Sequence, residues 1–200
     1  MVIAALYAGQ QLWNHYEVEP WTRDGRVKAD VIQIAPDVSG LVTQVPVQDN
    51  QDVKAGDLLF EIDRARFQLA LDQAQASLRA QTVAHEQALR DAQRNKSLGQ
   101  LVAAEVLEQS QTHVQQTEAA IAEARVQLDT ARLNLARSRV LAARDGRVTN
   151  LDLRVGAYAT AGHAVMALVD AGSFYVEGYF EETKLPRIHE GDPVIVTLMG

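Results

Sequence analysis

Large apolar residues recur every seven positions in the second half of a long block of helix-forming residues. From position 64 to 139 the chain has no proline and one glycine, Gly99, and alanine, glutamine, arginine, leucine and glutamate dominate. The large residues of the repeat are Leu107, Val114, Ile121, Leu128 and Leu135. Three positions after each stands a small one: Ser110, Thr117, Ala124, Ala131 and Ser138. This alternation is typical of a close-packed seam between two helices.

The first half of the block carries the same repeat more weakly. Its two registers are Phe67, Ala74, Gln81, Ala88 and Leu71, Leu78, His85, Ala92. Gly99, near the middle, is the natural turn, so we predict an antiparallel helical hairpin with arms of roughly 64–99 and 103–139. Each arm would span on the order of 50 Å. One thin seam is little burial, so such a rod is expected to project from a domain and to pack against copies of itself or a partner.

The segments that flank this block resemble each other at a constant offset of 106 positions. The offset aligns Gly40–Ile62 with Gly146–Leu168 and pairs Gly40 with Gly146, Val42 with Val148 and Gly56 with Gly162. Apolar residues within each copy predict short half-buried strands, and the glycines predict turns. A copy of about 25 residues is too small to bury a core alone. We therefore predict one β-sandwich built from both copies, with the hairpin inserted between them.

The two ends of the chain are predicted separately. The first thirteen residues are apolar but shorter than the roughly 20 residues of a membrane-spanning helix. They are a fraying helix or, as we favour, the end of a membrane anchor, followed by the interfacial aromatic residues Trp13, Tyr16 and Trp21. In the tail, residues 174–180 and 194–198 read as strands of a further β-unit, which two or three strands cannot close.

Composition excludes several classes of function. With no cysteine there is no disulfide, zinc-thiolate site or thiol nucleophile. The formal net charge of -7 argues against a nucleic-acid surface, and the five histidines are scattered. No nucleophile, P-loop or dinucleotide motif occurs, so we expect neither an enzyme nor a bound cofactor. A lipoyl carrier is disfavoured because no lysine stands near Asp63, and Lys54, Lys96 and Lys184 read as surface residues.

Repeat, insertion and their order together resemble the membrane fusion proteins, the periplasmic adaptors of the HlyD/EmrA/AcrA superfamily. The similar segments are residues 29–63, the hairpin, residues 141–170 and residues 173–185. Residues 20–40 and 173–185 look most like the AaeA-like branch, which serves efflux of aromatic carboxylic acids such as p-hydroxybenzoic acid. The resemblance implies a subunit that is anchored in the inner membrane and faces the periplasm of a Gram-negative bacterium. It also implies self-association, possibly as a hexamer, an inner-membrane transporter and an outer-membrane TolC-type channel as partners, and no catalysis.

The resemblance also suggests docking residues at the hairpin tip. Many adaptors that dock on TolC-type channels carry Arg, Leu and Ser around the turn, with Leu four residues after Arg. Arg94 and Leu98 have that spacing. The serine is missing: Glu105 stands eleven residues after Arg94, and Ala103 is the nearest candidate by local similarity. This departure weakens the expectation of TolC-type docking.

The predicted fold class is therefore α+β and elongated: a split lipoyl-like sandwich with an inserted helical hairpin, followed by the start of a β-barrel. The expected segments are an anchor end and linker (1–22), a first lipoyl half-motif (23–63), the hairpin (64–139), a second half-motif (140–171) and an incomplete barrel (172–200). An adaptor for type I protein secretion and a coiled-coil scaffold are the alternatives. The short arms favour efflux, and the β repeat disfavours the scaffold.

Overall fold

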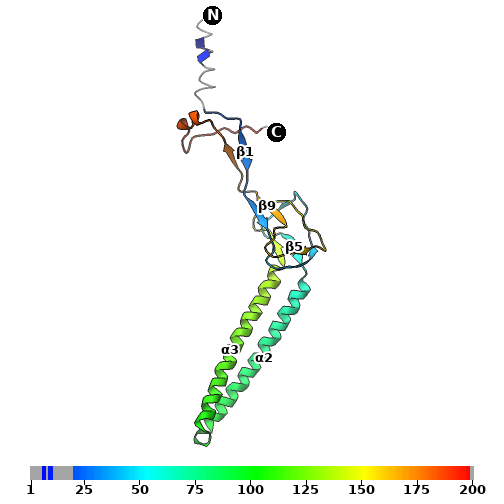
Figure 1. The fold of residues 1–200 in the computed structure, drawn as a ribbon, viewed down its shortest axis with the longest axis vertical. Coiled ribbons are helices and arrows are strands. Elements are labelled where there is room, and N and C mark those ends of the chain that lie inside the picture. Colours follow the sequence, from blue (N-terminus) through cyan, green and yellow to red (C-terminus); the bar gives the residue numbers. More distant parts are fainter. Residues whose placement is uncertain (1–5, 8, 11–19, 199–200) are drawn as a thin grey trace. The chain divides into compact units, whose positions relative to one another are not determined.

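The computed structural model describes residues 6–7, 9–10 and 20–198 (Figure 1). The chain divides into two compact units, Val31–Gly172 in one and Met1–Asp30 with Ser173–Gly200 in the other. Most of the predicted anchor end, with Trp13 and Tyr16, lies outside the described residues. Within the described part, no helix has both the length and the apolar character needed to cross a membrane.

The larger unit contains two four-stranded antiparallel sheets. One has the strand order β2-β9-β7-β4 and the other β6-β5-β3-β8. The first is built from β2 (Val31–Ile34), β9 (Met166–Asp170), β7 (Gly146–Thr149) and β4 (Asp52–Val53). The second is built from β6 (Arg139–Leu141), β5 (Leu58–Ile62), β3 (Gly40–Gln44) and β8 (Tyr158–Ala159). Each sheet thus takes strands from both sides of the hairpin.

A pseudo-twofold relation at the predicted offset connects the two sheets. The backbone N–H of Val42 donates to the carbonyl of Ala157 at 2.8 Å, and the N–H of Val148 donates to the carbonyl of Gln51 at 2.9 Å. Moving 106 positions forward from Val42 gives Val148, and moving 106 positions back from Ala157 gives Gln51. The two hydrogen bonds are therefore equivalent under the offset. The strand registers follow the same rule, since Gly40 pairs with Ala159 and Gly146 with Val53. Each half-motif therefore completes the sheet of the other.

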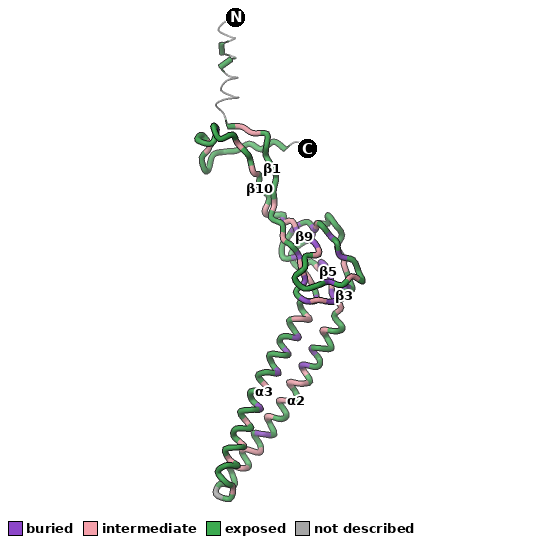
Figure 2. The backbone as a smooth tube through the Cα atoms, in the orientation of Figure 1, coloured by how far each residue is buried: buried purple, intermediate pink, exposed green. Residues whose placement is uncertain are grey.

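The core lies between the sheets and draws on both halves of the sandwich. Val42, Val148, Ile62 and Leu168 are fully buried, and they form two pairs under the offset. Other buried members of the same cluster include Val47, Val53, Leu59, Phe60, Leu151, Leu153, Ala159 and Met166. Figure 2 shows this burial concentrated in the sandwich at the root of the hairpin. The structure confirms the predicted fold class.

Turns in the sandwich also repeat. Asn50 and Gly156 have φ of 63° and 89°, and Gly56 and Gly162 have φ of 91° and 78°. These are left-handed backbone conformations, which glycine adopts freely and asparagine tolerates. The glycines that begin β3 and β7 serve another purpose. A Cβ at Gly146 would lie 2.2 Å from the carbonyl oxygen of Val169, so only a residue without a side chain fits there.

The hairpin consists of α2 (Arg64–Ser97) and α3 (Ala104–Arg137), joined by the short 3-10 turn η2 (Gly99–Leu101). Asp63 caps α2, its carboxylate accepting a hydrogen bond from the N–H of Ala65 at 3.0 Å. At the far end Gly99 takes a φ of 54°, which ends the helix in the way glycine commonly does. Both arms have 34 residues, so each is about 50 Å long.

The smaller unit pairs β1 (Gly25–Lys28) with β10 (Tyr175–Gly178) and continues into the 3-10 helix η3 (Glu182–Arg187). The prediction of a strand at 194–198 is wrong. In the described part of the chain this stretch pairs with no strand, and its apolar side chains are exposed. Without a neighbouring strand its backbone has no ladder partner.

The prediction that Lys184 is a surface lysine is also wrong. Only 9% of Lys184 is exposed. Its ammonium lies 5.3 Å from the ring centroid of Trp21, while the guanidinium of Arg23 lies 5.5 Å from the same ring. The ammonium also forms an ion pair with the carboxylate of Glu181 at 3.9 Å. A cation over an aromatic face is stabilised without full hydration, so Trp21 helps to compensate the burial of this lysine.

We expect Gly146→Ala to destabilise the sandwich. The added methyl would overlap the Val169 carbonyl, which belongs to the ladder and cannot move aside like a side chain. Overpacking of this kind costs about 1–3 kcal/mol, measurable by chemical denaturation. Gly25→Ala is the control, since its Cβ would meet only the Val176 side chain at 3.8 Å. Equal stability of the two variants would contradict the predicted clash.

A second prediction concerns Asp52, which accepts hydrogen bonds from Arg147 at 2.8 and 3.0 Å across β4 and β7. Those bonds hold the pKa of the Asp52 carboxyl below its usual value. The pair therefore stabilises the fold above the carboxyl's unfolded pKa, and the contribution is lost as pH falls through the lowered, folded pKa. Asp52→Asn should lower the melting temperature at pH 7, and the difference in melting temperature should shrink as pH falls below the ordinary aspartate pKa of about 4. A difference in melting temperature between wild type and variant that stays constant with pH would contradict this prediction.

Candidate functional site

Several contacts between the two arms of the hairpin show which residues of α2 and α3 lie opposite each other. Near the sandwich, Leu71, Ala74, Leu128 and Ala131 form a buried apolar cluster, with Leu78 and Leu135 packed against it. Further out, His85 and Thr117 meet across the seam at 2.9 Å. Because the arms are antiparallel, moving one residue toward the tip on α2 corresponds to moving one residue toward the N-terminus of α3. With His85 opposite Thr117, Ala74 lies opposite Leu128 and Leu71 lies opposite Ala131.

The structure places the residues of the seven-residue repeat as follows. Leu128 is buried, and Leu107, Val114, Ile121 and Leu135 are half-buried. Of the small residues between them, four are buried and Ser110 is half-buried; the buried ones are Thr117, Ala124, Ala131 and Ser138. Figure 2 shows these positions spaced along otherwise exposed helices. Small residues let the helix backbones approach closely, so the seam is narrow and both helices keep most of their surface in solvent.

His85 brings a polar interaction into this seam. The Thr117 hydroxyl lies 2.9 and 3.1 Å from the backbone carbonyls of Val114 and His113 and 2.9 Å from Nδ1 of His85. The tautomer of the imidazole sets which of the two side chains donates across the seam. A part-buried polar pair of this kind favours one register of two packed helices over shifted ones.

The roots of the hairpin are fixed by hydrogen bonds and ion pairs. Glu61 of β5 lies between Arg64, at 3.9 Å, and Arg139, at 3.6 Å, and these arginines flank the two ends of the hairpin. Arg137 forms a 3.3 Å ion pair with Asp37, and the buried Ser138 accepts a backbone hydrogen bond from Ile62 at 2.8 Å. These contacts hold both arms against the sandwich.

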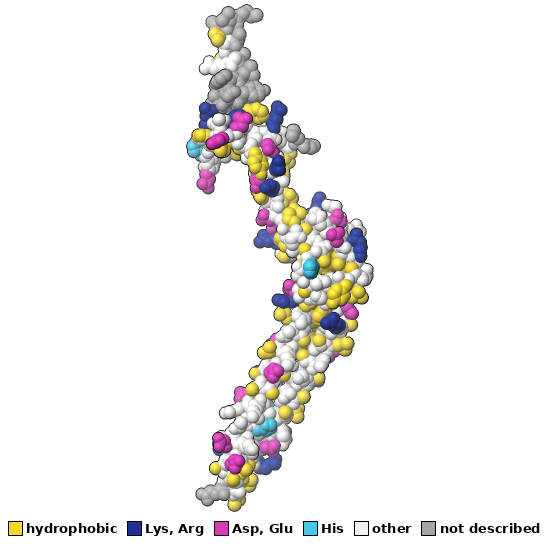
Figure 3. Space-filling view, in the orientation of Figure 1, with side chains coloured by type: hydrophobic (Ala, Val, Ile, Leu, Met, Phe, Trp, Pro, Cys, Tyr) yellow, Lys and Arg dark blue, Asp and Glu magenta, His cyan; other side chains and the backbone are white. Residues whose placement is uncertain are grey.

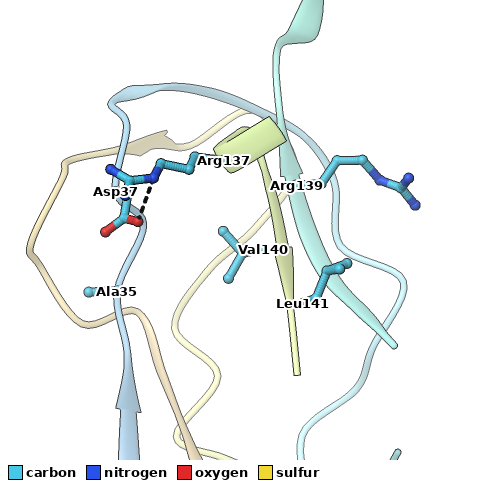
Figure 4. Close-up of a pocket in the computed structure, with 6 residues that line it drawn as sticks. All are labelled: Ala35, Asp37, Arg137, Arg139, Val140 and Leu141. Carbon is cyan, nitrogen blue, oxygen red and sulfur yellow. Dashed lines mark ion pairs between the residues drawn. The ribbon is translucent and has the colours of Figure 1, made fainter. Parts of the chain in front are cut away.

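A shallow pocket lies at this root (Figure 4), lined by Ala35, Asp37, Arg137, Arg139, Val140 and Leu141. Arg137 reaches toward Asp37, while Arg139 points away from it. The two guanidinium groups are thus engaged by Asp37 and Glu61 and do not converge on one point. Among the residues that the structure describes, no group of three or more His, Asp or Glu side chains could hold a metal ion.

The hairpin tip presents apolar and basic side chains to solvent. Arg94 is exposed and forms an ion pair with Asp91 at 3.5 Å. Leu98, at the end of α2, is 45% exposed, and Ala103, which precedes α3, is exposed and gives that helix no side-chain cap. Sequence reasoning missed Leu101, which is 86% exposed in the turn itself. An apolar residue two positions after a turn glycine was the available signal.

We expect Leu128→Asp to separate the arms of the hairpin. The carboxylate would replace a buried leucine at the apolar cluster with no cation in the seam to pair it, which costs several kcal/mol. Loss of helical circular dichroism and a lower melting temperature would report this. Gln116→Asp, at an exposed position of α3, is the control. Equal helix content and melting temperature in the two variants would contradict the seam.

Comparison with known proteins agrees with this geometry. Residues 30–171 match the family of RND membrane fusion proteins in its barrel-sandwich hybrid domain. The uncharacterised protein YdhJ of Escherichia coli (strain K12) is 43% identical over 199 residues, which are 99% of this chain and 70% of YdhJ.

Two solved structures share the fold at low sequence identity. The membrane fusion protein Spr0693 of Streptococcus pneumoniae R6 superposes with a TM-score of 0.66 at 20% identity, covering 82% of this chain and 70% of that one. The periplasmic adaptor protein EmrA superposes with a TM-score of 0.52 at 20% identity, covering 88% and 83%. The family match and the relationship to YdhJ decide the assignment: this chain belongs to the RND membrane fusion proteins, the non-enzymatic periplasmic adaptors of efflux systems.

Proposed function

We propose that this adaptor links an inner-membrane transporter to a TolC-type outer-membrane channel in a tripartite efflux pump. It would be anchored by a segment that ends within residues 1–22, face the periplasm of a Gram-negative bacterium and act as several associated copies, possibly six. The observation that supports this best is a rigid hairpin rooted at both ends in one sandwich, with an apolar tip. Such a rod suits a partner that is reached at a distance.

The tip is the proposed docking site for the channel. Leu98, Leu101 and Val106 are exposed on either side of the turn. Exposed apolar groups on a narrow end are costly in water and are covered on binding. Arg94 lies one helical turn before Leu98 and adds a guanidinium suited to carboxylates or carbonyls of a partner. Ala103 stands on the opposite side of the turn. Because alanine there offers no hydroxyl for a hydrogen bond, the apolar contact would contribute most to binding of the channel.

Aromatic carboxylic acids are the proposed cargo of the pump. The support is the resemblance of residues 20–40 and 173–185 to AaeA-like adaptors. We expect the transporter to select the cargo, because the one shallow pocket described above has both of its arginines engaged in ion pairs. Other drugs are the wider class of cargo for the same role.

Protein export by a type I system is the alternative use of the same fold. Adaptors of that pathway generally have much longer hairpins, and arms of 34 residues favour the efflux role. A coiled-coil scaffold is disfavoured by the split sandwich, which such a scaffold does not need.

Deleting the gene should sensitise the bacterium to p-hydroxybenzoate, and wild-type protein should restore tolerance. The variant Leu98→Asp should fail to restore it, since a carboxylate at the tip would have to be desolvated against an apolar surface of the channel. Minimum inhibitory concentrations measure both effects. Gln93→Asp, exposed on the same helix, should restore tolerance fully.

The outcomes separate cargo from docking. A deletion strain that resists p-hydroxybenzoate normally but becomes sensitive to other compounds would overturn the proposed cargo. Full rescue by Leu98→Asp, at wild-type expression, would overturn the docking role of the tip.

A further inference from the structure

Lys184 is a buried cation whose charge is poorly satisfied by the groups around it. It lies in η3 with 9% of its surface exposed. Its ammonium forms one ion pair, with Glu181 at 3.9 Å, and the side chain of Glu181 is itself 76% exposed. In the described part of the chain no oxygen accepts a hydrogen bond from this ammonium. An ammonium carries three donors, and a buried charge without hydrogen-bonded partners is unfavourable, so the position favours binding of an anion.

A second cation lies against the same aromatic ring. The Lys184 ammonium is 5.3 Å and the Arg23 guanidinium 5.5 Å from the ring centroid of Trp21. Arg23 is exposed and, among the residues that the structure describes, pairs with no carboxylate. The neighbouring Asp24 lies 3.5 Å from Arg26 instead. One ring is therefore flanked by two cations, in a chain whose formal net charge is -7.

Hydrogen bonds hold together the two segments that supply these side chains. The Thr22 hydroxyl donates to the carbonyl of Tyr179 at 2.6 Å, and the N–H of Tyr179 donates to the carbonyl of Asp24 at 2.9 Å. These bonds extend the pairing of β1 with β10, and η3 follows directly. All of these residues belong to the smaller unit. On the face that Figure 3 draws, this unit shows Lys and Arg side chains beside hydrophobic ones.

Further aromatic side chains lie close to this pair of cations. Trp21 and Phe180 are half-buried, and Tyr179 is 50% exposed. The Phe180 ring and the Thr22 methyl both lie over Gly178, where an added Cβ would be 3.0 and 3.5 Å from them. A second ring is thus held next to position 22. Aromatic rings stack on other aromatic groups, so these surroundings suit an aromatic ligand better than a bare anion.

We propose that Lys184 and Arg23 bind the carboxylate of an aromatic acid at the Trp21 ring. The buried ammonium stays in place, the exposed guanidinium swings from the ring to the carboxylate, and the ring of the acid takes its place on Trp21. A guanidinium can bind both carboxylate oxygens, and the attraction to a buried cation is weakly screened by water. This inference rests on the proposed cargo and adds that the adaptor itself contacts the acid, while the transporter still selects it.

Nuclear magnetic resonance of the Trp21 indole N–H tests the site. The chain has two tryptophans, so Trp13→Phe leaves Trp21 as the one indole reporter in the whole protein. At constant pH and ionic strength, p-hydroxybenzoate should shift this signal in a saturable way. The neutral p-hydroxybenzamide keeps the ring and lacks the charge, whereas acetate keeps the charge and lacks the ring. Each should bind at least about tenfold more weakly.

Two exposed arginines give a matched pair of variants. Arg23→Gln should weaken binding of p-hydroxybenzoate roughly tenfold with unchanged circular dichroism. Arg26→Gln is the control, since Arg26 also lies 5.5 Å from an aromatic ring, that of Tyr179, and should bind like wild type. Lys184→Gln should abolish binding. Because Lys184 is buried, its melting temperature is measured alongside, and Arg23→Gln keeps the test valid if that variant unfolds.

Other outcomes overturn the proposal at distinct points. The absence of a saturable shift, or equal weakening by Arg23→Gln and Arg26→Gln, would overturn the site. Acetate that binds as tightly as p-hydroxybenzoate would overturn the aromatic class, and p-hydroxybenzamide that does so would overturn the role of the cations. A deletion strain that is sensitive to p-hydroxybenzoate, from a protein that does not bind it, would overturn this site and leave the proposed cargo standing. Binding by a protein whose deletion leaves tolerance unchanged would overturn the cargo and leave the site.

Discussion

Neither half of the sandwich can bury a core without the other, and every further feature of the larger unit depends on that constraint. Val42 and Ile62 come from before the hairpin, and Val148 and Leu168 come from after it, yet all four are fully buried together. Each half-motif also supplies strands to both sheets. The chain ends of the hairpin are therefore held side by side by the densest packing in the molecule.

That fixed root gives the hairpin its properties. Ion pairs from Glu61 and Asp37 reach arginines at both arms, and the His85–Thr117 contact holds the register farther out. The seam uses small residues, so little apolar surface is needed to keep the helices together. The tip is exposed for contacts with other proteins. An adaptor of this design uses its exposed surfaces for contacts with other proteins, and none of its described side chains forms a reaction centre.

The fold class was predictable because its signals survive in one sequence. Gly40 and Gly146 must be small where β3 and β7 begin, and the offset between them marks both the duplication and the insertion. The seven-residue repeat likewise marks positions that are buried or half-buried. Lys184 was misjudged because its cover, Trp21, lies far away in the sequence. The levels at which the residues of the two arms meet could not be predicted beforehand, since they depend on how the turn at Gly99 closes.

The insertion of the hairpin between the two half-motifs has a consequence for how the chain folds. Strand pairs such as Gly40 with Ala159 join residues very distant in sequence, and closing a long flexible loop is entropically costly and slow. Helices form much faster than such pairings. Once α2 and α3 have zipped together, residues 62 and 139 are already neighbours, and the effective loop shrinks to a few residues. The rod that reaches outward in the finished protein is thus also the device that brings the two halves of its own base together.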